Sequence, residues 1–244
     1  MRVYVSAELL KLRSTRTTVA LVAAMVALVL LSSLLTSLLG RPAELGDAQI
    51  QRSLLGIGSI ASVFSALTGT LLVTSEYRYG TIRPSSLFAS RRAVLLAAKL
   101  AVGCCSGLVL GIIAEALAFS IGLSVLSERA IPFALSSTGA LQLGLGTVAS
   151  AGLWGVIGVG LGAIIRNQVG AIVGLLAWVF VVENIVFALA PSVGRFSPGR
   201  AQDALVGMSI THLLAPGEGA LVLVAWAAVL ALGGLRLSIR RDIA

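Results

Sequence analysis

Charged residues are scarce in this chain. Asp, Glu, Lys and Arg make up 11% of its 244 residues and 57% are hydrophobic, whereas soluble globular domains carry roughly 25% charged residues. The mean hydropathy is +1.01. This composition excludes a water-soluble domain and predicts an all-α membrane protein.

The residues that build metal sites and active sites are few and isolated. Histidine occurs once, as His212, and the two cysteines, Cys104 and Cys105, are adjacent on a predicted helix, where neighbouring side chains point in different directions. No zinc-protease motif, nucleophile elbow or dinucleotide-binding motif is present. We therefore predict no catalytic residue, no metal site and no disulfide.

A phosphate-binding loop is also absent. Such a loop requires G-x-x-x-x-G-K-[ST], and the only two lysines, Lys11 and Lys99, follow Leu10 and Ala98 instead of glycine. The chain is therefore not predicted to be an enzyme of this ATPase class or to bind a cofactor. If ATP powers its activity, another polypeptide must hydrolyse the ATP.

Six apolar stretches lack Lys and Arg, and most reach the 20 or so residues that a helix needs to cross a membrane. We expect six transmembrane helices within a single domain that covers residues 1–244. The predicted spans are residues 19–39, 54–74, 100–126, 139–165, 169–189 and 220–235.

The basic residues are unevenly distributed between the connections. With the N-terminus in the cytoplasm, only five of the eighteen Lys and Arg residues fall outside, namely Arg41, Arg52, Arg129, Arg195 and Arg200. The positive-inside rule then predicts a multi-pass protein of the cell membrane with both termini cytoplasmic. The same sorting explains the net charge of +8 without a nucleic-acid partner, since no basic face is interleaved with exposed aromatic residues.

The segment before the first span, VYVSAELLKLRSTR, is typical of an interfacial helix. The alternative is a frayed basic tail that only sets the topology. In a helix we expect its leucines to face lipid and its basic residues to face headgroups: Leu9, Leu10 and Leu12 on one side, and Lys11, Arg13 and Arg16 on the other.

Small residues recur at intervals of four positions in three of the predicted spans. Because helices in lipid approach closely where side chains are small, these positions predict helix packing faces. The third span carries Gly103, Gly107 and Gly111, in register with Glu115; the second carries Gly58, Ser62, Ala66 and Thr70; the fourth carries Gly158 and Gly162.

Two acids lie inside predicted spans. Glu115 is near the midpoint of the third span, and Glu183 stands beside Asn184 in the outer half of the fifth. A lone carboxylate at the centre of a membrane is strongly destabilised, so Glu115 should be protonated, hydrogen-bonded to a hydroxyl or hydrated. Both acids fit either a polar contact or protonation step in a substrate path, or an interhelical hydrogen bond.

The longest outer connection covers residues 190–219. Ser197 followed by Pro198 favours a helix start, and Pro216 with Gly217 favours a stop, so residues 199–215 are predicted to be helical. The apolar content of this segment indicates that it is half buried at the outer face or re-entrant. The alternative is a surface helix that only links two spans.

The connection between the second and third spans is basic and is the largest on the cytoplasmic side. It contains Arg78, Arg83 and the pair Arg91 and Arg92. We expect Thr81 to cap a short helix in which Leu87 and Phe88 provide apolar contacts. A solvated basic segment that only enforces topology is the alternative.

Three stretches of this sequence, together with the six spans, resemble the permease subunits of type-2 ABC transporters. They are SAELLKLRSTRTT near the N-terminus, SEYRYGTIRP at the end of the second span and GLGAIIRNQVGAIVG around the fourth and fifth spans. The most specific part is similar to the family pattern E-Y-R-x-G-T-x-R and comprises Glu76, Tyr77, Arg78, Gly80, Thr81 and Arg83.

The resemblance implies that the segment from Glu76 to Phe88 contains a coupling helix, which docks on a separate ATP-hydrolysing subunit. Members of the family work with two such ATPase subunits, which bind the ATP and Mg, and with two permeases that are identical or related. They usually export hydrophobic or amphipathic compounds such as drugs, lipids or peptides.

Two other function classes stay open. An ion-coupled secondary transporter would need its own ion site, for which Glu115 and Glu183 are the only material. A regulatory membrane subunit without transport activity is the other. The sequence does not predict the substrate, because membrane permeases of one architecture carry unrelated cargo.

Overall fold

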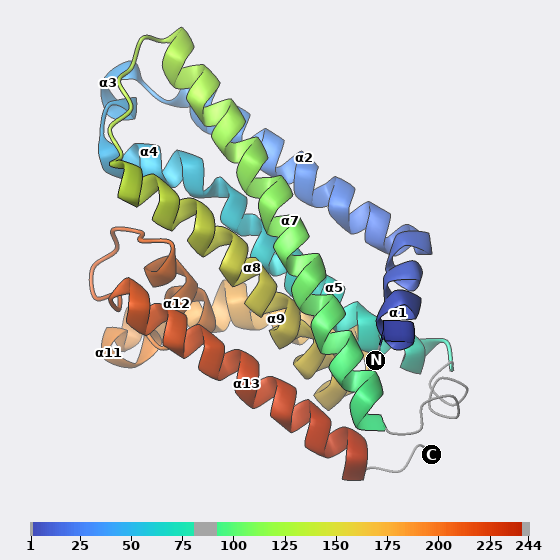
Figure 1. Cartoon of the computed structure of the whole chain (residues 1–244). Helices are drawn as coiled ribbons and strands as arrows, with labels where there is room; N and C mark the ends of the chain where they lie inside the picture. Colours follow the sequence, from blue (N-terminus) through green and yellow to red (C-terminus); the bar gives the residue numbers. More distant parts are fainter. Residues whose placement is uncertain (1, 81–91, 241–244) are drawn as a thin grey trace.

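The computed structural model describes residues 2–80 and 92–240, and within these ranges the chain is helical and contains no strand (Figure 1). The elements in chain order are α1 (Arg2–Ser14), α2 (Arg16–Leu39), α3 (Pro42–Leu45), α4 (Ala48–Leu55), the 3₁₀ helix η1 (Gly56–Ile60), α5 (Ala61–Arg78), α7 (Arg92–Glu128), α8 (Ser137–Ile165), α9 (Gln168–Ala177), the π-helix η2 (Trp178–Val182), α10 (Glu183–Leu189), α11 (Pro191–Gly194), α12 (Pro198–Leu205) and α13 (Pro216–Arg240).

In the described part of the chain, six helical segments are long and apolar enough to cross a membrane. This confirms the predicted helical architecture with six candidate spans and is the architecture of a multi-pass membrane protein. The segments are Arg16–Leu39, Ala48–Arg78, Ala93–Glu128, Ser137–Ile165, Gln168–Leu189 and Pro216–Ser238.

The helices extend beyond the apolar stretches from which the spans were predicted. α7 begins at Arg92 and carries Lys99 in its second turn, and the sixth segment begins at Pro216. The expectation that Pro216 ends a helix is therefore wrong. Proline lacks only an N–H that would have no partner in the first turn, so it starts α13 without loss.

The predicted outer helix over residues 199–215 is also too long. α12 begins at Pro198 with Ser197 before it, as expected, but ends at Leu205. Gly207 takes a left-handed conformation with φ of +75°, and the N–H of Met208 donates to the carbonyl of Asp203 over 2.9 Å. This pattern ends a helix at a glycine.

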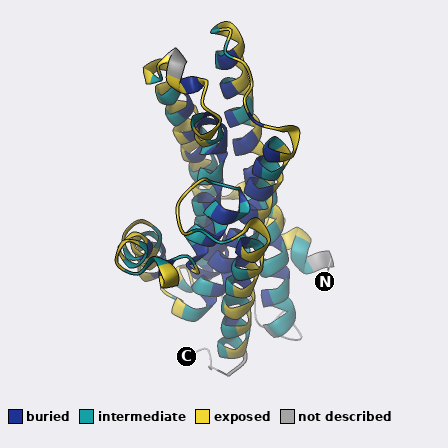
Figure 2. Cartoon of the chain, turned by 90° about the vertical axis from the view of Figure 1, so that its left-hand side faces the viewer, coloured by how far each residue is buried: buried dark blue, intermediate teal, exposed yellow. Residues whose placement is uncertain are grey.

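α8 lies at the centre of the bundle and packs against α5, α7 and α13. In the second and fourth candidate spans, 61% of the most apolar window is buried, compared with 17% in the first and 11% in the fifth. Figure 2 shows buried residues on the inward sides of the helices and exposed residues along their outer faces. α2 and the α9–α10 segment therefore present most of their surface outward.

Glycines bring the central helices into backbone contact. A Cβ at Gly155 of α8 would overlap the carbonyl oxygen of Gly103 in α7, and one at Gly158 would overlap that of Ala66 in α5. The stripe of Gly103, Gly107 and Gly111 faces α8, and Gly158 and Gly162 face α5. These five glycines thus lie where α8 approaches α5 or α7 closely, and a Cβ at Gly107 or Gly158 would overlap backbone atoms of the facing helix.

We predict that Gly155→Ala destabilises the bundle, whereas Gly144→Ala does not. Both substitutions raise helix propensity by about 0.8 to 1 kcal/mol, but a Cβ at Gly155 meets backbone and one at Gly144 meets nothing within 4 Å. Overpacking at Gly155 should cost about 1 to 3 kcal/mol. Thermal unfolding of the purified variants in detergent measures the difference, and equal stability of the two would contradict this account of the helix contacts.

Candidate functional site

The residues that most closely match the family pattern lie at the end of α5. Glu76, Tyr77 and Arg78 form its last turn, and Gly80 follows with φ of +67°. No atom lies within 4 Å of a Cβ built at Gly80, so backbone conformation, not space, favours glycine there. The other predicted coupling residues, Thr81, Arg83, Leu87 and Phe88, lie outside the described residues.

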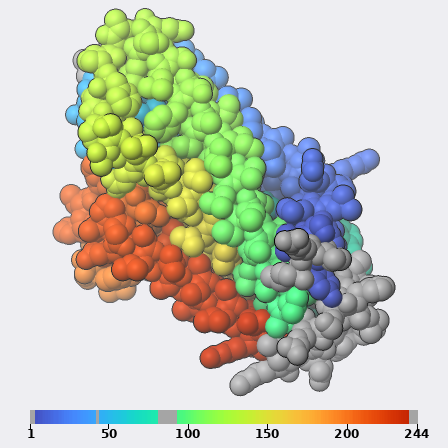
Figure 3. Space-filling view, viewed as in Figure 1, coloured from blue at the N-terminus to red at the C-terminus, as the bar shows by residue number. Residues whose placement is uncertain are grey.

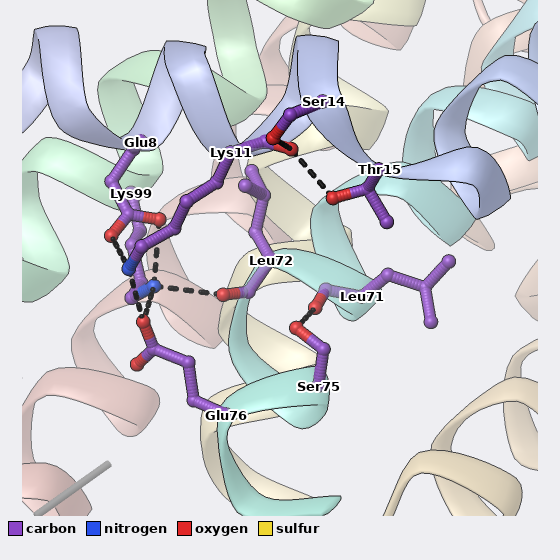
Figure 4. Close-up of polar contacts among 9 residues, drawn as sticks. All are labelled: Glu8, Lys11, Ser14, Thr15, Leu71, Leu72, Ser75, Glu76 and Lys99. Carbon is purple, nitrogen blue, oxygen red and sulfur yellow. Dashed lines mark hydrogen bonds and ion pairs between the residues drawn. The ribbon is translucent and has the colours of Figure 1, made fainter. Parts of the chain in front are cut away.

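Glu76 belongs to a cluster of four charged side chains that joins three helices (Figure 4). Lys11 of α1 places its Nζ 2.8 Å from Oε1 of Glu8 and 2.8 Å from Oε1 of Glu76. Lys99 of α7 places its Nζ 2.8 Å from Oε2 of Glu8 and 3.0 Å from Oε1 of Glu76. Lys99 also donates a hydrogen bond of 2.8 Å to the carbonyl of Leu72 in α5. We call these four residues the ion cluster.

The ion cluster is buried on all but one side. The side chains of Glu8, Lys99 and Glu76 are 2%, 3% and 5% exposed, whereas that of Lys11 is 50% exposed. Two positive and two negative charges balance, which offsets the cost of removing each from water. Because every charge depends on partners from another helix, the cluster fixes α1, the end of α5 and the start of α7 relative to one another.

Lys11 does not face the way predicted for an interfacial helix, and Leu12 is only partly exposed. Leu9 and Leu10 are 40% and 69% exposed, as expected, but Leu12 packs against the core around Leu72. Lys11 turns toward Glu8 and Glu76 because two buried carboxylates attract it more strongly than surrounding headgroups would. α1 is a formed helix packed against α7, in contrast to the alternative of a frayed tail.

The pKa of Lys11 reflects this environment. Burial of part of the side chain lowers the pKa, but hydrogen bonds and charges from Glu76 and Glu8 together outweigh burial and raise it above the ordinary value of 10.5. A raised pKa means that the stabilisation from protonated Lys11 is complete below pH 10.5 and is lost as the pH rises beyond the shifted value. Lys11 is therefore protonated and positively charged at neutral pH.

Tyr77 and Arg78 connect the same end of α5 to other helices. The guanidinium of Arg166, at the end of α8, lies 5.4 Å from the ring centre of Tyr77 and donates to the carbonyl of Leu237 in α13 over 3.0 Å. Arg78 is exposed and donates to Gln168 over 3.4 Å. Glu76 is buried in this turn, whereas the charge of Arg78 reaches the surface.

Glu115 is buried between three elements in the middle of the bundle. Its carboxyl group lies against Gly58 of η1, where any side chain larger than hydrogen would overlap it. The buried hydroxyl of Thr147 in α8 is its hydrogen-bonding neighbour, and no described residue forms an ion pair with Glu115. No described contact joins Glu115 to Glu183.

Glu183 and Asn184 bind the segment that carries α12. Oε2 of Glu183 accepts a hydrogen bond of 2.9 Å from the N–H of Gly199, at the start of α12. Oδ1 of Asn184 accepts one of 2.6 Å from Arg200. At the other end of α12, Arg52 donates to the carbonyls of Val206 and Gly207 over 3.2 and 2.9 Å. A carboxyl oxygen thus accepts from an N–H at the first turn of α12, and a guanidinium donates to carbonyls just after its last turn, so both ends of the helix have hydrogen-bond partners.

The sequence interpretation missed the ion cluster as a unit. Glu8 and Lys99 are 91 positions apart, and Lys11 and Glu76 are 65 positions apart. One signal was available, since the only two lysines of the chain, Lys11 and Lys99, both belong to the cluster. Lysine strongly prefers water, so its use inside an apolar helix indicates an acidic partner.

Comparison with known proteins adds no relative. No protein-family model matches the chain, and no curated protein matches it either. Function must therefore be inferred from the geometry and from the resemblance of the short motifs.

Loss of Lys99 should destabilise the protein more than loss of Lys11. Lys99→Met leaves two buried carboxylates undercompensated, which costs about 3 to 5 kcal/mol. Lys11→Met should cost less, because its half-exposed ammonium is partly hydrated and water screens its ion pairs. The double variant Lys99→Met, Glu8→Gln should recover part of the loss, since it removes one charge of each sign. Thermal unfolding in detergent tests the series, and a fully stable Lys99→Met protein would show that the cluster does not hold the helices.

Proposed function

We propose that this chain is the transmembrane subunit of an ATP-driven exporter of the type-2 ABC class. The observation that supports this most is the ion cluster. It ties the helix that enters residues 81–91 to the helix that leaves them, and it ties both to α1. A force applied to this connection would therefore displace three elements together.

In this proposal the ion cluster and the adjacent connection face the cytoplasm, and a separate subunit binds ATP and Mg and hydrolyses the ATP. Two copies of that subunit would close on binding ATP and press on residues 76–88. Glu76 is internal, so it transmits the displacement, while the exposed Arg78 is available to contact the ATPase. The chain itself contributes no nucleotide chemistry.

The bundle supplies a path for such a displacement. The ends of α5 and α7 carry the ion cluster, and both helices meet α8 through backbone contacts at glycines. Hydrogen bonds from Ser65 and Thr70 of α5 to the carbonyls of Ala151 and Gly158 in α8 reinforce these close contacts, so a displacement of α5 reaches α8. Rocking of α5 and α7 about α8 would then open a pathway between this chain and a second permease, identical or related.

The exported compound is proposed to be hydrophobic or amphipathic, such as a drug, lipid or peptide. The described chain offers few polar groups to a substrate, because Glu183 and Asn184 are engaged with α12. Glu115 is a buried acid inside a candidate span, and no described residue forms an ion pair with it. That feature favours, as the second candidate, an ion-coupled secondary transporter in which Glu115 carries a proton.

Affinity purification in mild detergent tests the first proposal. An ATP-binding protein should co-purify with the chain and with Arg41→Glu, which reverses an exposed charge in the connection after α2. Arg78→Glu should lower the co-purified amount about tenfold, equivalent to about 1.4 kcal/mol of binding free energy. Membrane insertion of all three proteins should be equal.

Failure to recover an ATP-binding protein with the unmodified chain would contradict the proposal. Transport that depends on pH, proceeds without ATP and is lost in Glu115→Gln would favour the secondary transporter.

A further inference from the structure

A groove of about 590 Å³ opens between α1 and α2 on one side and α5 and α7 on the other. Its walls are almost entirely apolar, with Leu12, Val19, Val22 and Val26 facing Val109 and Leu110. The volume lies within the range of about 300 to 1,000 Å³ that small-molecule and cofactor sites occupy. In Figure 3 the blue surface of α1 and α2 borders the green surface of α7 along this side.

The groove runs alongside helices that are built to cross a membrane. Its contents therefore come from the bilayer, whose hydrocarbon chains match an apolar lining. Val19 and Val109 are 60% and 54% exposed, so the groove is open to its surroundings along its length. An acyl chain could enter sideways without any opening of the helices.

A positive charge without a partner stands at one end of the groove. Arg13, in the last turn of α1, lines the groove and is exposed, and within the described residues it makes no hydrogen bond or ion pair. The lysine charges nearby are already balanced by Glu8 and Glu76 in the ion cluster. Arg13 thus remains available for an anion, and its planar guanidinium suits the two oxygens of a phosphate.

A smaller recess of about 70 Å³ adjoins the groove and shares Leu12 and Thr18 with it. Its lining includes Lys11, Glu8 and Glu76 of the ion cluster, whose charges balance one another. The uncompensated charge beside the apolar surface of the groove is therefore that of Arg13. An apolar surface followed by a basic group matches an anionic phospholipid, in which the acyl chain is followed by the phosphate of the headgroup.

We propose that the groove binds one anionic phospholipid, with an acyl chain between α2 and α7 and the phosphate against Arg13. The lipid bridges α1 and α2 to α7 next to the ion cluster, so its presence stabilises the docked position of α1. This site requires only that the helices lie in a bilayer, and it does not depend on the proposed transport function.

Cys105 provides a direct probe, because it lines the groove and is exposed, whereas its neighbour Cys104 does not line it. The full chain with Cys104→Ala would be reconstituted in phosphatidylcholine vesicles, with or without phosphatidylglycerol. An uncharged maleimide avoids any effect of the vesicle charge on reagent concentration. We expect phosphatidylglycerol to slow modification of Cys105 several-fold.

Arg13→Gln should remove this protection, and the matched variant Arg16→Gln, whose side chain does not line the groove, should retain it. A cysteine at exposed Leu232 of α13, in a chain with Cys104→Ala and Cys105→Ala, should react equally in both vesicles. Equal modification of Cys105 in the two lipid compositions would overturn the proposal. This comparison requires no substitution of a residue that lines the groove. Protection that persists in Arg13→Gln would overturn it as well.

Discussion

The mutual neutralisation of four charges in an apolar setting is the constraint on which the organisation of this protein depends. Glu8, Glu76 and Lys99 are almost fully buried, and only Lys11 reaches the surface. A buried charge that loses its partner is far more costly than an exposed one. The elements that carry these residues are therefore held at one relative position, and α1 becomes part of the bundle.

The rest of the bundle complements this junction. Away from the ion cluster, α5, α7 and α8 meet through glycines whose backbones touch, and the hydroxyl groups of Ser65 and Thr70 in α5 donate hydrogen bonds to carbonyls of α8. At the other end, Glu183 and Arg52 hold the two ends of α12 against the spans. The molecule thus has polar ties at its two ends and close glycine contacts with a few hydrogen bonds between them, an arrangement suited to passing a displacement along rigid helices.

Much of the fold could be predicted because it follows from local composition and spacing. The apolar runs mark the spans since hydrocarbon excludes charge, and the four-residue spacing of Gly103, Gly107 and Gly111 marks a packing face since a helix returns to one side at that interval. The ion cluster could not be predicted in this way, because its partners come from distant parts of the chain. Counting Lys11 and Lys99 as topology signals concealed that both have acidic partners. The end of α12 was missed because a single residue, Gly207, decides it.

The central claim is that the end of α5 beside the ion cluster faces the cytoplasm, where an ATPase can reach it. Tyr79 is 70% exposed at this end, so a cysteine there, in a chain without Cys104 and Cys105, reports which side of the membrane it occupies. A membrane-impermeant maleimide should label Tyr79→Cys in inside-out vesicles and leave it unlabelled in intact cells. Labelling in intact cells would place the junction on the outer face and contradict the account.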